Sequence, residues 1–256
     1  MSGLPERARV GLLIKPLAFF CVGSGMPSLE ADITFYTMPI MAPDGPVEIK
    51  VIPGSTVKGV LRSSASRICH LLGLRSCKEL RPEFISKAHE EGVCDVCALF
   101  GYPGSNSPSP LETTDFYLVP REEKAIEIFE KGLMSSLVAS SAGREAFRTL
   151  TRIRLWDKSL TVAPGGLFTL EVLNPMWLFY GEIRLYRGLL EARGARLSWE
   201  NACKLLMAAI AEMRFYCLGK KTMVDAKIVG QEGLYVEGPV ASILYDGLRR
   251  WAHESI

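Results

Sequence analysis

VIPGSTVKGVLRSSASR, residues 51–67, is the most informative stretch of this sequence. From Ser55 onward, apolar residues recur at the three- and four-residue spacing of a helix that buries one face. Gly73 suits the end of this helix, because glycine readily adopts the left-handed conformation that closes one. The apolar face comprises Val57, Val60, Leu61, Ala65, Ile68, Leu71 and Leu72. The pattern therefore predicts an amphipathic helix over about residues 55–72.

The first turns of this predicted helix combine cations with free backbone N–H groups. A helix N-terminus exposes unpaired amides and the positive end of the helix dipole, which favour an anion such as phosphate. Lys58 and Arg62 stand four residues apart and share one helical face, with Ser55 in the first turn. The alternative is a surface helix with solvated cations. A nucleotide-binding P-loop is disfavoured, because Val60-Leu61 stand where it requires Lys followed by Ser or Thr.

The segments around this helix predict an α+β protein. Residues 23–53 are rich in proline and predict a long loop, and Pro164-Gly165-Gly166 predicts a turn. We expect strands at 8–22, 113–119, 148–155, 166–173, 178–185 and 234–236, and helices from Ser198 and Pro239. This order fits a modified ferredoxin-like, RNA-recognition-motif-like antiparallel sheet with helices on one face and inserted lid and thumb segments.

The length of 256 residues suits one elaborated domain, residues 1–256. We expect two additions to it, an insertion at about 74–112 and a hairpin at about 148–172. The formal net charge of +2 is too balanced to indicate a nucleic-acid partner, so any basic surface must be local.

Composition also bears on location and source. Hydrophobic residues make up 48% of the chain, yet no apolar run reaches the roughly 18–20 residues that cross a bilayer. The first residues lack the apolar region of a signal peptide, so we expect a cytoplasmic protein. Asparagine occurs only at 106, 174 and 201 and glutamine only at 231, a depletion typical of a thermophile.

Seven cysteines in a chain expected inside the cell favour metal binding over disulfides. Cys94-Asp-Val-Cys97 has the spacing that lets two thiolates meet one zinc ion, and Cys77 supplies a third. We choose His70 as the fourth ligand of this structural site, with Cys69 as its alternate, because Cys69 belongs to the core side of the helix. A Cys77–Cys94 or Cys69–Cys77 disulfide, or unligated thiols, are the alternatives.

Arginines alternate with other residues along the predicted strand 148–155. Period-two spacing places Arg152 and Arg154 on one face of the sheet, with Trp156 next along the chain. Guanidinium groups in this arrangement can hold a phosphate backbone while an aromatic ring stacks on a base. A solvated strand face is the alternative.

Three stretches together resemble the RAMP superfamily of CRISPR-associated proteins, and most of all the backbone subunits of type III (Csm/Cmr) effector complexes. They are VIPGSTVKGVLRSSASR at 51–67, CDVCALFG at 94–101 and TRIRLWDKSLTVAPGGLFTLEVLNP at 151–175. The resemblance implies a protein of antiviral defense that binds guide RNA (crRNA), with the Lys58–Arg62 face on its phosphates and the hairpin near 152–166 as a thumb. The implied partners are single-stranded guide RNA, complementary target RNA, other type III subunits and further copies of the chain in a filament, but no membrane.

The same resemblance bears on catalysis. In type III backbone subunits an aspartate in the loop before the Pro-Gly-Ser motif cleaves target RNA, whereas Thr37 takes that position here and Asp32 is the displaced substitute. A hydroxyl does not bind a divalent cation as a carboxylate does. Near the C-terminus, Lys220 and Lys221 replace a glycine-rich turn that contacts RNA in relatives.

These features predict a guide-binding subunit without essential catalysis. The alternative is a metal-dependent endoribonuclease that cuts target RNA at regular intervals through Asp32, with Mg²⁺ or Mn²⁺. A guide-processing enzyme is less well supported, because His89 and His253 have the character of ordinary surface residues.

Overall fold

The computed structural model describes residues 6–42, 45–79, 81–90, 92–131, 146–157, 159–193, 196–219 and 222–234. The strands are β1 (Arg7–Pro16), β2 (Thr37–Ala42), β3 (Gly45–Ile52), β4 (Leu111–Thr113), β5 (Phe116–Val119), β6 (Phe147–Leu155), β7 (Val162–Leu173), β8 (Leu178–Tyr186), β9 (Cys217–Leu218) and β10 (Thr222–Glu232). The helices are α1 (Gly54–Ile68), α2 (Pro82–Ile85), α3 (Asp95–Phe100), α4 (Glu122–Lys131), α6 (Arg187–Ala192) and α7 (Trp199–Met213), with 3₁₀ turns η1 (Cys69–Leu72) and η2 (Lys87–His89).

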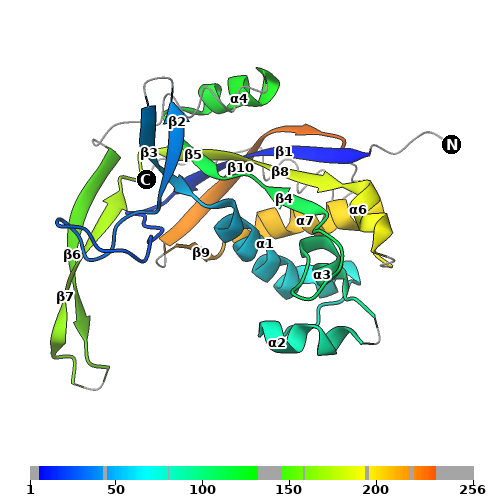
Figure 1. Ribbon diagram of the computed structural model, residues 1–256, viewed down its shortest axis with the longest axis horizontal. Coiled ribbons are helices and arrows are strands. Elements are labelled where there is room, and N and C mark those ends of the chain that lie inside the picture. Colours follow the sequence, from blue (N-terminus) through cyan, green and yellow to red (C-terminus); the bar gives the residue numbers. More distant parts are fainter. Residues whose placement is uncertain are drawn as a thin grey trace.

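An eight-stranded sheet forms the centre of the molecule (Figure 1). Its order is β2-β3-β5-β8-β1-β10-β9, with β4 also paired to β8, and each pairing is antiparallel. Along the chain, β1, α1, β5, β8, α7 and β10 follow one another as β-α-β-β-α-β. The expected α+β class with an antiparallel sheet is therefore confirmed.

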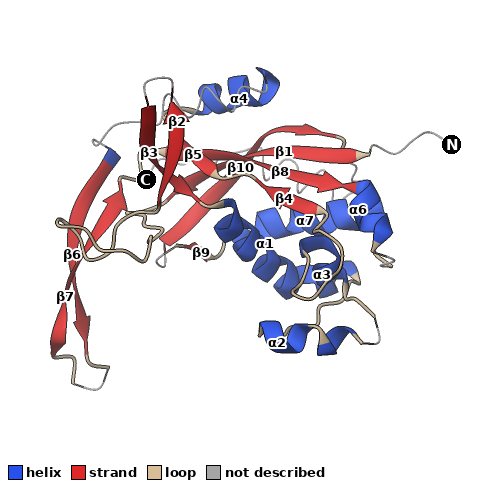
Figure 2. Ribbon diagram, viewed as in Figure 1, coloured by secondary structure: helices blue, strands red, loops and turns tan. Residues whose placement is uncertain are grey.

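Helices cover both faces of this sheet (Figure 2). Side chains alternate along β1, so Leu12 and Ile14 join the main core with α1 and α7, while Leu13 joins a second core on the opposite face. That second core is closed by α4, whose Phe129 packs near Tyr180. The prediction of helices on one face only missed α4, although its apolar residues have helical spacing.

A pair of glycines lets Phe129 of α4 pack closely against the sheet. Gly11 and Gly230 lie directly opposite each other on β1 and β10. A Cβ on either glycine would collide with the Phe129 ring, so the ring lies on bare backbone. The guanidinium of Arg9 lies 4.0 Å above the same ring and donates a hydrogen bond to the Phe129 carbonyl oxygen.

The predicted helix after Pro53 is α1 continued by η1, and Gly73 closes it with φ of 70°. The second helix begins as expected, with the Ser198 side chain accepting the Asn201 N–H at 3.2 Å. The prediction of a long loop at 23–53 was wrong, because this segment contains the β2–β3 hairpin. The last described strand is β10 at 222–232, and of the strand predicted at 234–236 only Leu234 is described, outside any strand. The helix predicted from 239 lies outside the described residues.

The hairpin β6–β7 forms a separate two-stranded sheet that extends away from the body (Figure 1). Its turn lies at 156–161, where the backbone N–H of Trp156 donates to Thr161. The turn predicted at 164–166 instead belongs to β7. Gly166 lies so close to the backbone oxygen of Arg154 that a Cβ would not fit, and the strand register shifts there.

No helix among the described residues is long and apolar enough to span a membrane.

Candidate metal centre and cationic helix face

Lys58 lies on the side of α1 that faces the segment before β4. Its ammonium donates hydrogen bonds to the Ser109 hydroxyl at 2.8 Å and to the Leu111 carbonyl at 2.7 Å. Burial lowers the pKa of Lys58, and the nearby cations Arg193 and Arg62 lower it further. The lysine is therefore held by neutral acceptors within a positively charged environment.

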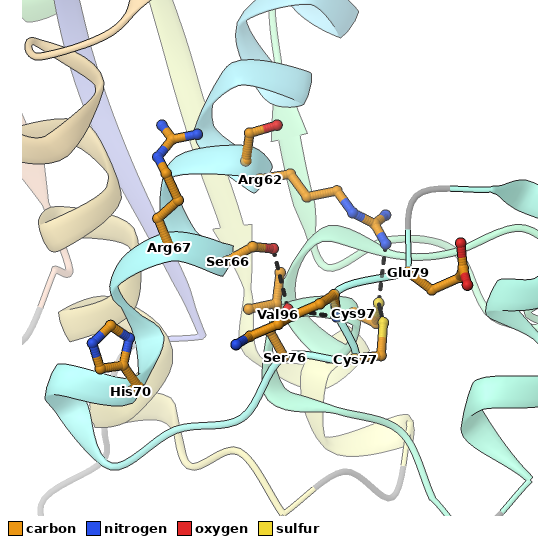
Figure 3. A pocket seen from close by; sticks show the side chains of 11 residues that line it. Arg62, Ser66, Arg67, His70, Ser76, Cys77, Glu79, Val96 and Cys97 are labelled. Carbon is orange, nitrogen blue, oxygen red and sulfur yellow. Dashed lines mark hydrogen bonds between the residues drawn. The ribbon is translucent and has the colours of Figure 1, made fainter.

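Arg62 lies one helical turn further along α1 and joins two parts of the insertion. Its guanidinium donates to the Gly101 carbonyl at 2.6 Å. It also donates to the Cys97 sulfur at 3.0 Å (Figure 3). The structure therefore places both predicted cations of the helix on one side. It also shows them bracing the insertion rather than standing free in solvent.

Arg193, just after α6, is the third cation of this group, and the sequence analysis missed it. It donates to the carbonyl oxygens of Ser107 at 2.6 Å and Pro108 at 3.0 Å. Burial lowers the pKa of Arg193. We call Lys58, Arg62 and Arg193 the cation cluster. Their hydrogen-bond acceptors among the described residues are carbonyl oxygens, a hydroxyl and a sulfur rather than carboxylates.

The N-terminus of α1 already holds a carboxylate. The Gly54 N–H donates to Asp115 at 2.7 Å, and a Cβ at Gly54 would collide with the Thr113 carbonyl oxygen. Ser55 is exposed beside this contact. The expected anion site at the helix end is thus partly filled by the chain's own Asp115, and the cation cluster lies along the flank of the helix.

Three cysteines and a histidine meet in the insertion. Cys77, His89, Cys94 and Cys97 each offer a ligand atom, and all of these atoms lie within 4.8 Å of one another. The Cys77 and Cys97 sulfurs are 3.7 Å apart, close to the edge of about 3.8 Å expected for a tetrahedron of zinc–sulfur bonds near 2.3 Å. We call this group the Cys3His cluster.

The histidine of this cluster fits a metal better than it fits any protein partner. His89 is buried, which overturns its interpretation as a surface residue, and among the described residues neither ring nitrogen has a hydrogen-bond partner of good geometry. Buried imidazole nitrogens normally have partners, and a metal would supply one here. His70 is exposed on η1, and the Cys69 thiol donates to the Ser66 carbonyl at 3.7 Å, so neither joins the group.

One cysteine of the cluster, Cys94, has a lowered pKa that favours the thiolate form. The side chain of Cys97 donates to the Cys94 sulfur and lowers the pKa of Cys94 to about 4, against the opposing effect of burial. The same contact raises the pKa of Cys97. A thiolate is the form of cysteine that binds zinc. Cys94 also accepts the Cys97 N–H at 3.4 Å at the start of α3, which fixes the two-residue spacing.

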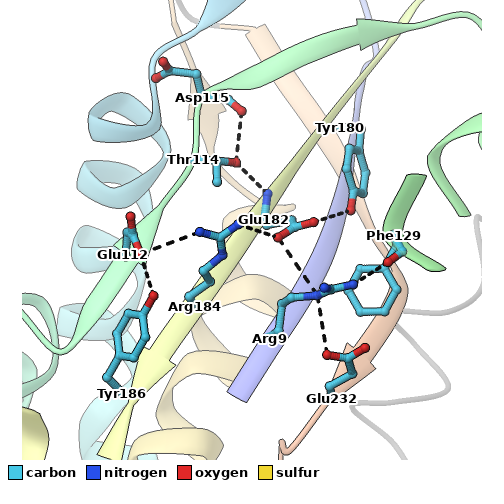
Figure 4. A network of polar contacts seen from close by, with 10 residues as sticks. All are labelled: Arg9, Glu112, Thr114, Asp115, Phe129, Tyr180, Glu182, Arg184, Tyr186 and Glu232. Atoms are coloured by element: carbon cyan, nitrogen blue, oxygen red, sulfur yellow. Dashed lines mark hydrogen bonds and ion pairs between the residues drawn. The ribbon is translucent and has the colours of Figure 1, made fainter. Parts of the chain in front are cut away.

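The face of the sheet opposite α1 carries another charged group, in which two arginines contact three carboxylates (Figure 4). Glu182 is buried on β8, where it pairs with Arg184 at 3.0 Å and accepts the Tyr180 hydroxyl at 3.2 Å. Arg9 lies 4.0 Å from Glu182 and 3.6 Å from Glu232. This is a structural network rather than a site for a charged ligand.

Arg152 and Arg154 lie on β6 near the hairpin tip, where both faces are exposed. Trp156, at the start of the turn, has 56% of its surface exposed. The cations and the aromatic side chain are therefore all accessible in the part of the hairpin that extends furthest from the body. Lys220 and Lys221 lie outside the described residues.

Asp32 is bound to the hairpin. Its carboxylate accepts the Thr169 N–H at 2.7 Å and the Thr169 hydroxyl at 2.9 Å, and these hydrogen bonds lower the pKa of Asp32. The group is exposed and ionised at neutral pH. Thr37, at the start of β2, donates its hydroxyl to the Phe35 carbonyl at 3.1 Å.

Comparisons with known proteins add one finding. A family model of the RAMP superfamily matches residues 39–221, which include most of β2, all elements from β3 to β9 and all four members of the Cys3His cluster. A search of the curated proteins found no match.

Proposed function

Because the chain belongs to the RAMP superfamily of CRISPR-associated RNA-binding proteins, we propose that it is a guide-RNA-binding backbone subunit of a type III interference complex. In this role it polymerises along the guide and presents it to target RNA, beside other type III subunits. The observation that carries the proposal is the cation cluster, where three cations converge and, in the described parts of the chain, none of them donates a hydrogen bond to a carboxylate.

RNA phosphates would replace neutral acceptors at this cluster. Lys58 and Arg62 now donate to carbonyl, hydroxyl and sulfur acceptors of residues 97–111. A phosphate oxygen adds the attraction between opposite charges to the hydrogen bond that a neutral acceptor offers, so a phosphate competes well for these donors. Ser55 and the exposed Arg152 and Arg154 extend the RNA path, and Lys220 and Lys221 are assigned to it from the sequence alone.

The architecture that serves this role is a single ferredoxin-like RAMP domain with two additions. The β-α-β-β-α-β order and the strand order β5-β8-β1-β10 support this core. Residues at about 74–112 form the lid insertion, and those at about 148–172 form the thumb. Zinc in the Cys3His cluster holds the insertion together, in a structural role with four protein ligands.

We expect the double substitution Arg152→Ala with Arg154→Ala to weaken binding of single-stranded RNA and to reduce its dependence on salt. Each phosphate contact to a single strand contributes about 0.7 to the slope of log affinity against log salt, so the slope should fall by about 1.4. The measurement is a fluorescence titration of labelled RNA over a range of salt concentrations.

The matched control is Lys124→Ala with Lys131→Ala, which removes two positive charges from α4 on the other side of the sheet. Its slope should equal that of the unmodified protein. An unchanged slope in the arginine variant would remove the hairpin from the RNA path. The arginines are preferable to Lys58 and Arg62 for this test, because those two also brace the insertion.

The second candidate function is a metal-dependent endoribonuclease acting through Asp32, and the ionised, exposed carboxylate favours it. The proposed noncatalytic role predicts that target RNA paired with the guide stays intact with Mg²⁺ or Mn²⁺ on a denaturing gel. Loss of regular cuts in Asp32→Ala alone would be ambiguous, because Asp32 also anchors Thr169. Thr169→Val removes the hydroxyl contact and keeps the carboxylate, so cuts that persist in Thr169→Val and vanish in Asp32→Asn would establish the nuclease.

A further inference from the structure

A hollow of about 470 Å³ lies beside the second half of α1, between the helix and the segment that follows η1 (Figure 3). Cys77 and Cys97 of the Cys3His cluster form part of its wall, and Arg62 lies at its edge. The volume falls within the range of about 300–1,000 Å³ typical of small-molecule sites. Lys58 itself does not belong to the described lining of this hollow.

Among the charged residues that line this hollow, Lys78 is the one whose side chain has no hydrogen-bond or ion-pair partner in the described part of the chain. Arg67 is held by two hydrogen bonds to Glu212, at 2.6 and 2.7 Å. Glu79, the one carboxylate in the described lining, accepts hydrogen bonds from Arg81. Lys78 also lines the hollow, and within the described part of the chain no hydrogen bond or ion pair holds its ammonium.

The local backbone conformation and two serines position Lys78 at this hollow. Lys78 has φ of 56°, a left-handed conformation uncommon for a residue with a side chain. The Lys78 N–H donates to the Ser76 hydroxyl at 3.2 Å, and Ser76 lies 3.2 Å from the Ser66 hydroxyl on α1. This turn holds Lys78 at the wall of the hollow, beside the Ser66 hydroxyl, which accepts from Ser76 and can itself donate to an anion.

We propose that this hollow binds a nucleoside monophosphate through its phosphate. An ammonium, a guanidinium and serine hydroxyls are the donors that phosphate oxygens accept. The space exceeds what a bare phosphate needs and admits an attached sugar. No aromatic side chain belongs to the described lining, so the phosphate and ribose, rather than a stacked base, are the recognised parts. His70 lines this hollow and has no place in the metal cluster.

The test is a calorimetric titration of the zinc-loaded full chain with adenosine monophosphate and with adenosine. The monophosphate should bind saturably and the nucleoside should not. Lys78→Ala should weaken binding about tenfold, the usual effect of losing one hydrogen bond to a charged group. Lys78→Gly should do the same while tolerating the positive φ, which guards against a folding defect in the first variant.

Lys131→Ala on α4 is the control of equal charge, and its affinity should match that of the unmodified protein. Absence of monophosphate binding, or equal affinity in both Lys78 variants and the control, would overturn the proposal. The phosphate can come from an RNA nucleotide or from a free nucleotide. Displacement of the monophosphate by single-stranded RNA identifies the first source, and its retention identifies the second.

These outcomes separate the hollow from the RNA path proposed above, with which it shares only Arg62. Long RNA that binds while the monophosphate does not would overturn the hollow alone. Monophosphate binding that depends on Lys78, in a protein that fails to bind RNA, would overturn the backbone function alone.

Discussion

Removing the zinc proposed for the Cys3His cluster with a strong chelator is expected to lower the free energy of unfolding by several kcal/mol, or the melting temperature by about 10 °C or more. The four ligands come from separate points of the insertion, namely the segment after η1, η2 and the start of α3. The short elements between them bury few apolar side chains, with Ile85 buried and Phe84 partly exposed. A metal bound to the cluster would therefore supply a cross-link that the packing does not.

Cys94→Ser should reproduce the chelator's effect and abolish zinc retention in elemental analysis. Cys217→Ser is the matched control, because Cys217 is an exposed free cysteine on β9. It should keep one zinc per chain and the original melting temperature. Full stability in a chain verified to be free of metal would contradict a structural role for the cluster.

Glu182→Ala is expected to lower the free energy of unfolding by about 3 kcal/mol, because it removes the buried carboxylate that lies between Arg9 and Arg184. The Glu182 side chain is only 2% exposed, and it pairs with Arg184 while facing Arg9. Arg9 also fastens α4 by donating to Phe129, so the loss should loosen that helix as well. Urea unfolding followed by circular dichroism measures the change.

Glu232→Ala provides the comparison, because Glu232 faces the same Arg9 but its side chain is 55% exposed. A pair at the surface contributes little, so the change should stay below about 0.5 kcal/mol. Glu182→Gln keeps the shape and should fall between the two. Equal free energies of unfolding for the Glu182→Ala and Glu232→Ala proteins would show that the buried carboxylate contributes no more to stability than the exposed one.

The elements that the sequence predicted best are those with a strong local signal. α1 and its close at Gly73 follow from periodicity and one glycine, and α7 follows from its Ser198 cap. The β2–β3 hairpin was missed because its prolines mask a strand pattern that only pairing with β5 stabilises. The glycines of β7 were read as a turn, although they form an irregularity inside a strand.

The candidate site was predictable where ligands are close in sequence. Cys94 and Cys97 follow from their spacing, whereas His89 was passed over for His70, although it lies only five positions before Cys94. The burial of the His89 imidazole distinguishes it from the exposed His70 as the fourth ligand, and the sequence alone does not show which histidine is buried. Arg193 had no local signal, since only the tertiary structure brings the end of α6 to the flank of α1.

The contact between Arg62 and Cys97 has a thermodynamic consequence. One guanidinium belongs at once to the surface proposed for RNA and to a ligand of the proposed zinc. If zinc raises the affinity for RNA by some factor, RNA must raise the affinity for zinc by the same factor, because both are parts of one closed cycle. An assembled complex would then release its metal more slowly than the free chain, and starvation for zinc would first affect the subunits not yet on a guide.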